Sequence, residues 1–312
     1  MNNIKNSQDV YKDLGESVIF STLKLNRKSH EDELNAISKL ADRLPSFINS
    51  LRIRVPEDNL NVSFGFSNNA WIYLFGKEAK KPKELETFTG LKNKHEMPGT
   101  DDDLFFHIRA NSQAPVFELM NDIMTILSPF VSVSDETHGF RYFEGRAIIG
   151  FIDGTEAPNK NDAVDYALIG DEDVDFIDGS YAFGQKWIHN MKNWENKTAE
   201  DQEKSIGRHK FSDIELEEDE KYSNAHNVAS KIEINGVEQK IVRMNVPFSN
   251  PSLQETGTYF IGYSKKWSVT KMMLEQMIEL DDKLLSFSTV ISGQLFFIPS
   301  LKTLSDIAEG NI

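Results

Sequence analysis

Residues 104–127 read LFFHIRANSQAPVFELMNDIMTIL, and they join a short apolar run to a segment with helical periodicity. The first seven residues favour a strand, and from Val116 onward apolar side chains recur every three or four positions, as on one helix face. The same order returns at 258–280, which reads TYFIGYSKKWSVTKMMLEQMIEL. Two similar strand–helix units predict a duplicated α+β fold rather than a doubly wound parallel sheet, in which helices and strands alternate.

Other segments of the N-terminal half also have a clear period. Three-and-four spacing of apolar residues over 31–51 predicts an amphipathic helix, with Ser29 as its cap and Pro45 as a residue that can kink or end it. The alternation over 60–66 predicts a half-buried strand. The apolar run 71–75 is interpreted as its hairpin partner, because a turn-prone Ser-Asn-Asn sequence lies between the two.

We expect the two units to meet at 145/146, which gives an N-terminal unit of residues 1–145 and a C-terminal unit of residues 146–312. The methionine-rich face of the helix over 269–280 is interpreted as core packing rather than as the wall of a cofactor site. The acidic stretch 215–220 is interpreted as a solvated loop, because it lacks the spacing of a calcium-binding loop.

Composition excludes several classes of function. The chain has 312 residues and a net charge of -15, which disfavours binding to nucleic acid or to an anionic membrane. It has no cysteine, which excludes disulfides, cysteine-ligated zinc, iron–sulfur clusters, thiolate-ligated haem and c-type haem attachment. A polar N-terminus and the lack of an apolar run of about 18 residues predict a cytoplasmic protein.

Motifs of the common enzyme classes are missing. The sequence has no GxSxG, no Walker A loop, no GxGxxG after a strand and no HExxH, so hydrolase, NTPase, nicotinamide and zinc-protease functions are disfavoured. Two segments remain as candidates for chemistry, and each also has an ordinary structural interpretation.

The first candidate segment is GFIDGTE, residues 150–156. The apolar run Ala147–Ile152 is predicted to be a strand that leads directly into Asp153. Glycines at 150 and 154 allow a positive φ or a close approach of the backbone to a flat ligand. An aspartate at a strand end can be half-buried, and burial raises a carboxyl pKa. The alternative is a common Asp-Gly turn.

The second candidate segment runs from AHNV at 225–228 to IVRMNVPF at 241–248. Arg243 lies in an apolar run, where burial of its cation is costly unless an anion pairs with it. His226 follows the acidic stretch and is a candidate metal ligand. The alternative for His226 is a surface histidine, or a core histidine with satisfied hydrogen bonds.

Taken in order, these segments resemble the dye-decolorizing peroxidases. The family motif GxxDG matches 150–154, and further matches follow in family order over the C-terminal half. The short length and the polar N-terminus are most similar to the cytoplasmic bacterial branch. The further matching blocks are IGR at 206–208, AHNV at 225–228, IVRMNVPF at 241–248, GTYFIGY at 257–263 and LFFIPS at 295–300.

The resemblance implies two ferredoxin-like halves with antiparallel sheets, and one haem b (iron protoporphyrin IX) held in the second half. It implies that His226 ligates the iron and that Asp153 and Arg243 are the catalytic residues on the opposite side. Arg208 is then a partner of a haem propionate, and Asp282 hydrogen-bonds the ligating histidine. The cofactor-binding set that the resemblance implies is Ile152, Gly154, Thr155, Glu156, Arg208, His226, Asn245, Phe260 and Asp282.

The function implied is reduction of hydrogen peroxide with oxidation of dyes or phenolic one-electron donors. Asp153 would move a proton and Arg243 would stabilise negative charge, with Arg243 as the larger contributor. Burial raises the pKa of Asp153 while the cation lowers it, and the sequence leaves open which effect dominates. The alternatives are a non-enzymatic haem-handling protein and a haem-free interaction domain. The resemblance also implies a homo-oligomer, whereas no sequence motif supports an encapsulating shell protein as partner.

Overall fold

The computed structural model describes residues 4–154, 158 and 162–312. The strands are Ser17–Leu25 (β1), Asn61–Phe66 (β2), Gly90–Lys92 (β3), Glu96–Pro98 (β4), Leu104–Ala110 (β5), Val131–Phe140 (β6), Ser180–His189 (β7), Ile232–Ile234 (β8), Val237–Gln239 (β9), Val242–Asn250 (β10), Glu255–Ser264 (β11), Ser288–Val290 (β12) and Gln294–Ile298 (β13). The α-helices are His30–Arg54 (α1), Asn68–Phe75 (α2), Gln113–Leu127 (α3), Ala163–Ala167 (α4), Met191–Glu195 (α5), Ala199–Ile206 (α6), His226–Ala229 (α7), Trp267–Glu279 (α8) and Leu301–Glu309 (α9).

Each half has the same strand order. In the first half, β1, α1, β2, β5, α3 and β6 follow one another, and the strands lie in the order β2-β5-β1-β6. In the second half, the strands β7, β10, β11 and β13, with α8 before the last of them, lie in the equivalent order β10-β11-β7-β13. Both orders are those of a ferredoxin-like βαββαβ unit. The α+β class and the duplication predicted from 104–127 and 258–280 are therefore confirmed.

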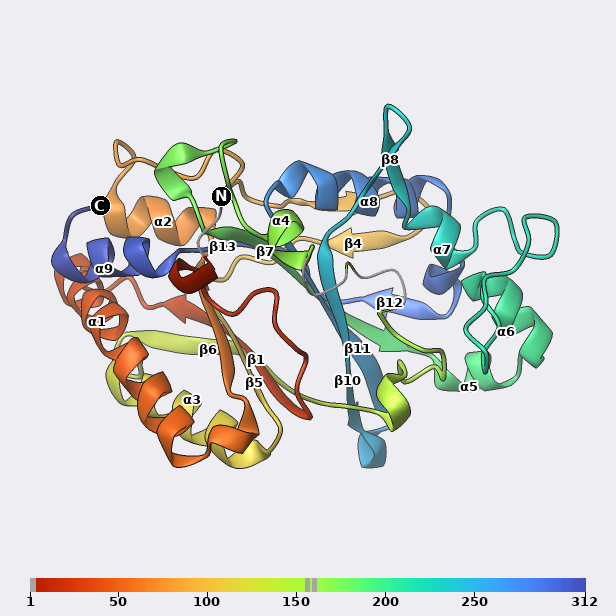
Figure 1. Ribbon diagram of the computed structural model, residues 1–312, viewed down its shortest axis with the longest axis horizontal. Coiled ribbons are helices and arrows are strands. Elements are labelled where there is room, and N and C mark those ends of the chain that lie inside the picture. Colours follow the sequence, from red (N-terminus) through yellow and green to blue (C-terminus); the bar gives the residue numbers. More distant parts are fainter. Residues whose placement is uncertain (1–3, 155–157, 159–161) are drawn as a thin grey trace.

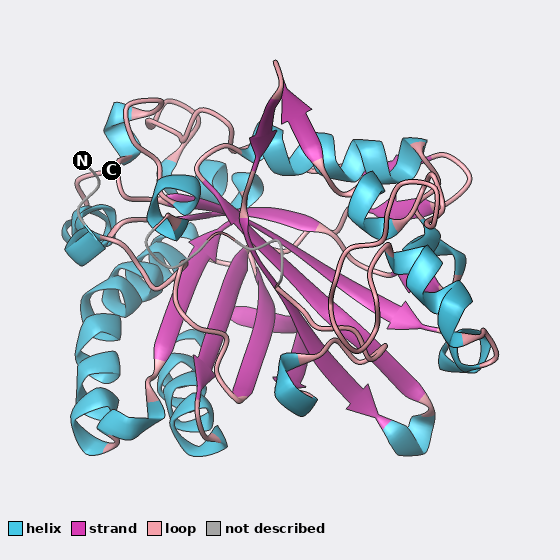
Figure 2. Cartoon of the chain, turned by 45° about the vertical axis from the view of Figure 1, so that its right-hand side comes forward, coloured by secondary structure: helices cyan, strands magenta, loops and turns pink. Residues whose placement is uncertain are grey.

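The two halves share one nine-stranded sheet with antiparallel pairing between its strands. They join where Phe297 of β13 pairs with Phe66 of β2. Helices α1 and α3 cover the sheet in one half and α8 covers it in the other, so the strands fan out between flanking helices (Figure 2). The last helix, α9, packs against α1, and both described ends of the chain lie near these helices (Figure 1).

The uncovered face of the sheet folds onto itself. Phe20 of β1 stacks on Tyr259 of β11, with ring centroids 3.9 Å apart. At the sheet edges, a Cβ on Gly139 of β6 would lie 2.3 Å from a methyl group of Val246 in β10. The sheet therefore curls until its two edge strands meet, and this closure creates a second buried core between the halves.

Residues 71–75 are not a strand. They form most of α2, and the Ser67 hydroxyl accepts the first free N–H of this helix, that of Ala70, at 3.1 Å. The prediction of a hairpin partner is wrong because the Ser-Asn-Asn sequence begins a helix instead of turning a hairpin. A serine cap satisfies a backbone donor that otherwise has no partner.

Two further expectations need correction. Pro45 does not end the first helix, which continues to Arg54. The strand β2 was expected to be half-buried, yet all its residues are buried. It lies in the middle of the sheet, between β5 and β13, where both faces are covered. Ser29 caps α1 as predicted, because its hydroxyl accepts the N–H of Asp32 at 3.4 Å.

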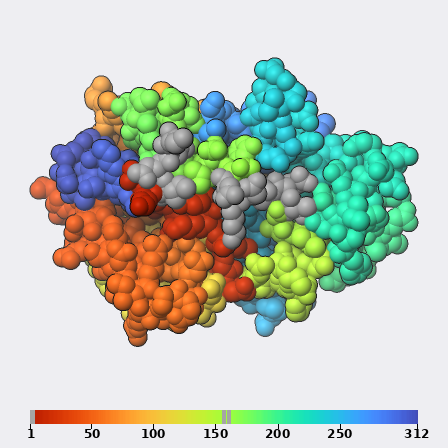
Figure 3. Space-filling model, viewed as in Figure 1, coloured from red at the N-terminus to blue at the C-terminus, as the bar shows by residue number. Residues whose placement is uncertain are grey.

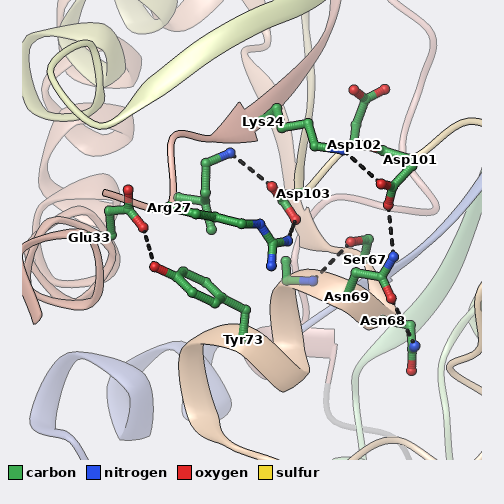
Figure 4. Close-up of polar contacts among 12 residues, drawn as sticks. Lys24, Arg27, Glu33, Ser67, Asn68, Asn69, Tyr73, Asp101, Asp102 and Asp103 are labelled. Atoms are coloured by element: carbon green, nitrogen blue, oxygen red, sulfur yellow. Dashed lines mark hydrogen bonds and ion pairs between the residues drawn. The ribbon is translucent and has the colours of Figure 1, made fainter. Parts of the chain in front are cut away.

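A buried polar cluster fixes α1 and α2 against the start of β5 (Figure 4). The Tyr73 hydroxyl donates to Glu33 at 2.7 Å, and Arg27 donates to the fully buried Asp103 at 2.6 Å. Burial, together with the Glu33 carboxylate, raises the pKa of Tyr73 to about 12, which keeps this hydroxyl protonated as a donor. Each buried carboxylate thus has a partner, as buried charge requires.

The second half ends in a lobe made of α5, α6 and the loop up to α7. This lobe, coloured green to cyan, forms the right-hand end of the molecule in the space-filling view (Figure 3). In the ranges that the structure describes, no helix combines the length and the apolar character needed to cross a membrane.

Candidate active site

The second half encloses a cavity of about 1070 Å³, counting its open mouth. The strands β7, β10 and β11 form one wall, α7 and α8 form another, and the segment 147–154 borders the cavity. A concave, largely apolar lining with a few polar side chains is typical of a ligand-binding site. Its lining includes Gln185, Trp187 and His189 of β7, Arg243 and Asn245 of β10, Thr258 and Phe260 of β11, His226 and Asn227 of α7, and Met273, Leu274 and Met277 of α8.

His226 stands at the first position of α7 with one ring nitrogen already engaged. Its Nδ1 lies 2.8 Å from Asp282 Oδ2, and Asp282 is 0% exposed. The other Asp282 oxygen accepts the backbone N–H of Leu284 at 2.8 Å. The carboxylate therefore holds the proton on Nδ1 and leaves Nε2 as the nitrogen with a free lone pair, the arrangement found in histidines that ligate metals.

Asp153 and Asn245 are joined on the strand wall. The Asn245 side-chain amide donates to Asp153 Oδ1 at 2.6 Å, and its backbone N–H donates to Oδ2 at 3.2 Å. Both oxygens of the carboxylate are thus held by one residue of β10. The pair brings together positions 92 residues apart in the sequence.

Arg243 lines the same wall two residues earlier on β10. Its neighbours Val242 and Met244 point to the other side of the sheet, into the core between the halves. The half-buried guanidinium makes no hydrogen bond or ion pair with any residue in the described part of the chain. Its N–H donors are therefore free to meet an anionic or polar ligand in the cavity, as the sequence suggested for a buried arginine.

The competition at Asp153 that the sequence left open is decided by burial. Burial raises the pKa of the Asp153 carboxyl above its usual range, although the Asn245 hydrogen bonds and the Arg243 charge act to lower it. The carboxyl therefore gains a proton more readily than an exposed aspartate does.

The segment before Asp153 is not the strand that the run Ala147–Ile152 predicted. It is a tight turn, closed by Ala147 N–H to Phe151 O and by Gly150 N–H to Ala147 O, both at 2.8 Å. Gly150 has φ +94°, which side-chain-bearing residues rarely adopt. The apolar residues face Trp194 and Phe287 in a separate small core instead of the sheet, and this packing is why the strand prediction is wrong.

Other predicted residues lie at the cavity in different ways. Ile152, Gly154 and Phe260 line it, and Gly154 has φ +80°. Arg208 also lines it, but its guanidinium is tied to Asp213, with Nε 2.9 Å from Oδ1. Thr155 and Glu156 fall outside the described residues.

The methionine-rich face of α8 both packs in the core and forms part of the cavity wall. Met273 and Met277 belong to the main hydrophobic core, and they also line the cavity. The interpretation as core packing alone is therefore incomplete. A core-facing methionine and a cavity-facing one have the same helical spacing, so the sequence contained no signal that distinguishes them.

The residues that hold the Asp153 turn in place were not predicted from the sequence. The Trp194 indole N–H donates to Ile149 O at 3.0 Å. Arg146 Nη1 donates to Gly150 O at 2.9 Å and to Lys210 O at 2.8 Å. Neither residue lies in a recognisable motif, so only an alignment with relatives or a structure can reveal their roles.

Comparisons with known proteins agree with this geometry. Residues 8–141 match the family model described as Dyp-type peroxidase, N-terminal, and residues 144–303 match Dyp-type peroxidase, C-terminal. The chain belongs to the Dyp-type peroxidase family. It is therefore a haem peroxidase, an oxidoreductase that acts on peroxide, and the resemblance seen in the sequence is confirmed.

Individual Dyp-type relatives match over nearly the whole chain. A dye-decolorizing peroxidase of Mycobacterium tuberculosis is 38% identical over 304 residues, which are 95% of this chain and 89% of that protein. The crystal structure of a dye-decolorizing peroxidase from Bacteroides thetaiotaomicron has a TM-score of 0.92 and 44% identity, covering 97% of this chain and 98% of that one.

Two other solved Dyp-type structures carry information on ligands and assembly. The encapsulated peroxidase from Mycobacterium smegmatis has a TM-score of 0.91 and 38% identity, covering 96% of this chain and 98% of that one. A variant of DypB from Rhodococcus jostii RHA1, solved in complex with heme, has a TM-score of 0.89 and 37% identity, with coverages of 93% and 95%. These solved structures share the duplicated α+β architecture of this Dyp-type peroxidase.

Proposed function

We propose that the cavity binds one haem b, and that His226 Nε2 would be the nitrogen that holds its iron. The donor set supports this assignment, because a neutral imidazole whose Nδ1–H is held by a carboxylate is a strong ligand for iron. The apolar side chains of Met273, Met277 and Phe260 suit the faces of a porphyrin.

Arg208 is proposed to hold an anionic edge of the haem. It is a cation in the largely apolar lining of the cavity, and its guanidinium is oriented by Asp213. Ile152 and Gly154 border the cavity and are the remaining described residues that we propose to contact the haem. Thr155 and Glu156 stay predictions. The division into residues 1–145 and 146–312 also stays part of the proposal.

The proposed reaction is reduction of hydrogen peroxide, followed by one-electron oxidation of two aromatic donor molecules. Bound haem supplies the electrons that break the O–O bond. Asp153 in its ionised form accepts a proton from peroxide and returns it to the departing oxygen. Arg243 directs its free N–H donors at the charge that develops there. Asn245 orients the Asp153 carboxylate through both oxygens.

One observation carries the proposal. His226 with its carboxylate lines the helix wall, while Asp153, Asn245 and Arg243 line the strand wall of the same cavity. A protein that only carries haem has no use for a carboxylate and a free guanidinium opposite the ligating histidine. The test is an absorption spectrum of the haem-loaded protein before and after one equivalent of peroxide. Bleaching without a distinct oxidised spectrum would favour haem handling over peroxidase chemistry.

Location and assembly remain predictions. We propose a cytoplasmic homo-oligomer, and we add no specific partner other than peroxide and a small aromatic donor. The encapsulated relative from Mycobacterium smegmatis makes a shell protein worth testing, by co-purification from cells that produce both proteins.

The pH dependence of the peroxide reaction should follow Asp153. Since only the ionised carboxylate accepts a proton, the second-order rate constant should fall as the pH decreases through the raised pKa of Asp153. The native state also favours protonated Asp153, so its contribution to the free energy of unfolding is largest at low pH and is lost as pH rises through that pKa. Stopped-flow mixing with peroxide at a series of pH values measures the first effect.

The control for this profile is Asp153→Asn, which cannot ionise. We expect its rate constant to lack the acidic step. If wild type shows no acidic step, or if the variant keeps the same step, then another group controls the profile and Asp153 is not the base.

Trp194 is proposed to position the Asp153 turn, and Trp194→Phe should reveal this role. The change removes the N–H that holds Ile149 O, which we expect to lower the free energy of unfolding by about 1–3 kcal/mol. A displaced Asp153 should also slow the peroxide reaction by about 10- to 100-fold. Urea denaturation and stopped-flow rates measure the two effects.

Trp71→Phe is the matched control. Trp71 is also fully buried, and its indole N–H donates to Lys80 O at 3.0 Å in the other half of the molecule. Trp71→Phe should lower the free energy of unfolding by a similar amount, while the rate of the peroxide reaction stays at the wild-type value. Equal slowing by both variants would mean that general destabilisation explains the result, and that Trp194 has no positioning role.

A further inference from the structure

A second cavity lies directly behind the first, on the opposite face of the same two strands. Along β7, Gln185 and Trp187 line the first cavity while Gly184 and Lys186 line the second. Along β11, Tyr259 lines the second cavity and its neighbour Phe260 lines the first. Successive strand residues point to opposite faces, so a single layer of sheet separates the two spaces.

The second cavity contains two hydroxyl groups without a protein partner. Thr22 is 8% exposed, its Oγ1 is buried, and no residue in the described ranges hydrogen-bonds to it. Tyr259 is 4% exposed, and its hydroxyl at the cavity also has no hydrogen-bond partner within the described ranges. Gly184 leaves room at this point, since a Cβ there would lie 3.0 Å from the Tyr259 hydroxyl. Buried polar groups normally have partners, so the Thr22 hydroxyl indicates that a polar ligand binds here.

The rim of the second cavity carries uncompensated negative charge. The backbone of Asp102 is fixed by Gln294 at 2.8 Å and 2.6 Å, but its carboxylate makes no hydrogen bond or ion pair within the described chain. In Figure 4 this carboxylate points away from the neighbouring polar cluster. The other two carboxylates of the lining are already paired, Asp101 with Lys24 at 2.7 Å and Asp135 with Lys186 at 2.8 Å. The charges of Asp102 and Asp135 also add to the effect of burial in raising the pKa of Tyr259.

The remaining wall of the cavity is suited to an aromatic ring. Phe296 and Ile291 supply apolar surface beside Tyr259, whose own ring is held by stacking on Phe20 at 3.9 Å. An aromatic molecule with a hydroxyl at one end and a cation at the other would satisfy all three features. Its hydroxyl would meet Tyr259 and Thr22, and its cation would meet Asp102.

We propose that this second cavity binds a small cationic phenol as an electron donor to the peroxidase. The redox part rests on the proposed function. Each bound phenol loses one electron through β11 to the peroxide-oxidised site and releases its hydroxyl proton through the cavity mouth. Two phenols and one peroxide thus yield two phenoxyl radicals and two water molecules. A donor that cannot enter the first cavity once haem fills it can still be oxidised in this way, because only an electron crosses the sheet.

The test uses tyramine as the cationic probe and 3-(4-hydroxyphenyl)propionate as its anionic counterpart. Calorimetric titration of the haem-loaded enzyme, without peroxide, should show saturable binding of tyramine. Asp102→Asn and Tyr259→Phe should each weaken binding about tenfold or more, as loss of a hydrogen bond to a charged or otherwise unpartnered group does. The anionic probe should bind at least about tenfold more weakly, because its charge repels Asp102.

Asp219→Asn is the matched control, because it makes the same change of net charge at an exposed position of the acidic loop. Its tyramine affinity should equal that of wild type. Tyr259→Phe should also keep its melting temperature, since the hydroxyl removed has no partner in the fold. That result separates loss of binding from loss of structure.

Three outcomes would overturn the proposal: no saturable binding of tyramine, unchanged affinity in Asp102→Asn and Tyr259→Phe, or equal affinity for both probes. The peroxide reaction of the wild-type enzyme is measured separately, without any donor. Its failure would remove the proposed function alone, whereas the titration reports on the second cavity whether or not peroxide reacts.

Discussion

Replacement of His226 by alanine should abolish haem binding and reduce peroxidase activity to background. In the described cavity lining, His226 is the one histidine whose Nδ1 is held by a buried carboxylate, which leaves its Nε2 free to bind a metal. Changing an outer partner of a metal ligand typically costs about 10- to 100-fold in affinity or activity, so losing the ligand itself costs more. The intense haem absorption band, measured after haem addition and gel filtration, is the direct readout.

Two further variants make this experiment specific. His209→Ala removes an exposed histidine that pairs with Glu203 of α6, and it should keep the haem and the activity. Asp282→Asn should keep haem but lower activity by about 10- to 100-fold, because a neutral amide polarises the imidazole less than a carboxylate does. A normal haem band in His226→Ala would contradict the assignment of the axial ligand.

Arg243→Leu should slow the reaction with peroxide by about 10²–10³-fold, and Asp153→Asn should slow it less. The geometry gives the reason for this order. The donors of Arg243 are free to meet developing charge, whereas both oxygens of Asp153 already accept hydrogen bonds from Asn245. A water molecule can replace a missing proton carrier, but it cannot replace a fixed positive charge. Both variants are compared with wild type by stopped-flow rate constants, measured at a pH at which Asp153 of the wild type is fully ionised.

Arg243→Lys and Arg141→Leu complete the series. Lysine retains the charge but not the planar fork of donors, so Arg243→Lys should fall between wild type and Arg243→Leu. Arg141 is an exposed arginine beside Glu16, and its replacement should have no effect on the rate. The opposite order of Asp153→Asn and Arg243→Leu would show that proton transfer, not charge stabilisation, limits the reaction.

Elements with a long and consistent period were predictable from the sequence. The strand–helix units at 104–127 and 258–280 appear as β5–α3 and β11–α8. Short apolar runs were not predictable, because their length fits several structures. Residues 71–75 became helix through the Ser67 cap, and 147–152 became a turn because Gly150 reverses the chain and Trp194 holds it.

The site shows the same limit. Local sequence pointed to Asp153, His226 and Arg243 as residue types in unusual surroundings, and family order suggested their roles. It gave no indication of Trp194, of Arg146 or of the two cavities placed back to back. These depend on which strands become neighbours, and therefore on contacts between residues far apart in the chain.

By itself, the sequence determined the α+β class, the duplication and the identity of the residues that can do chemistry, because periodicity and residue type are local properties. Only the tertiary structure decided that Asp282 reaches His226 across 56 positions and that Asn245 reaches Asp153 across 92. It also decided that burial outweighs the Arg243 charge in setting the pKa of Asp153. Burial and electrostatic balance arise from the packing of distant segments, and no local pattern encodes them.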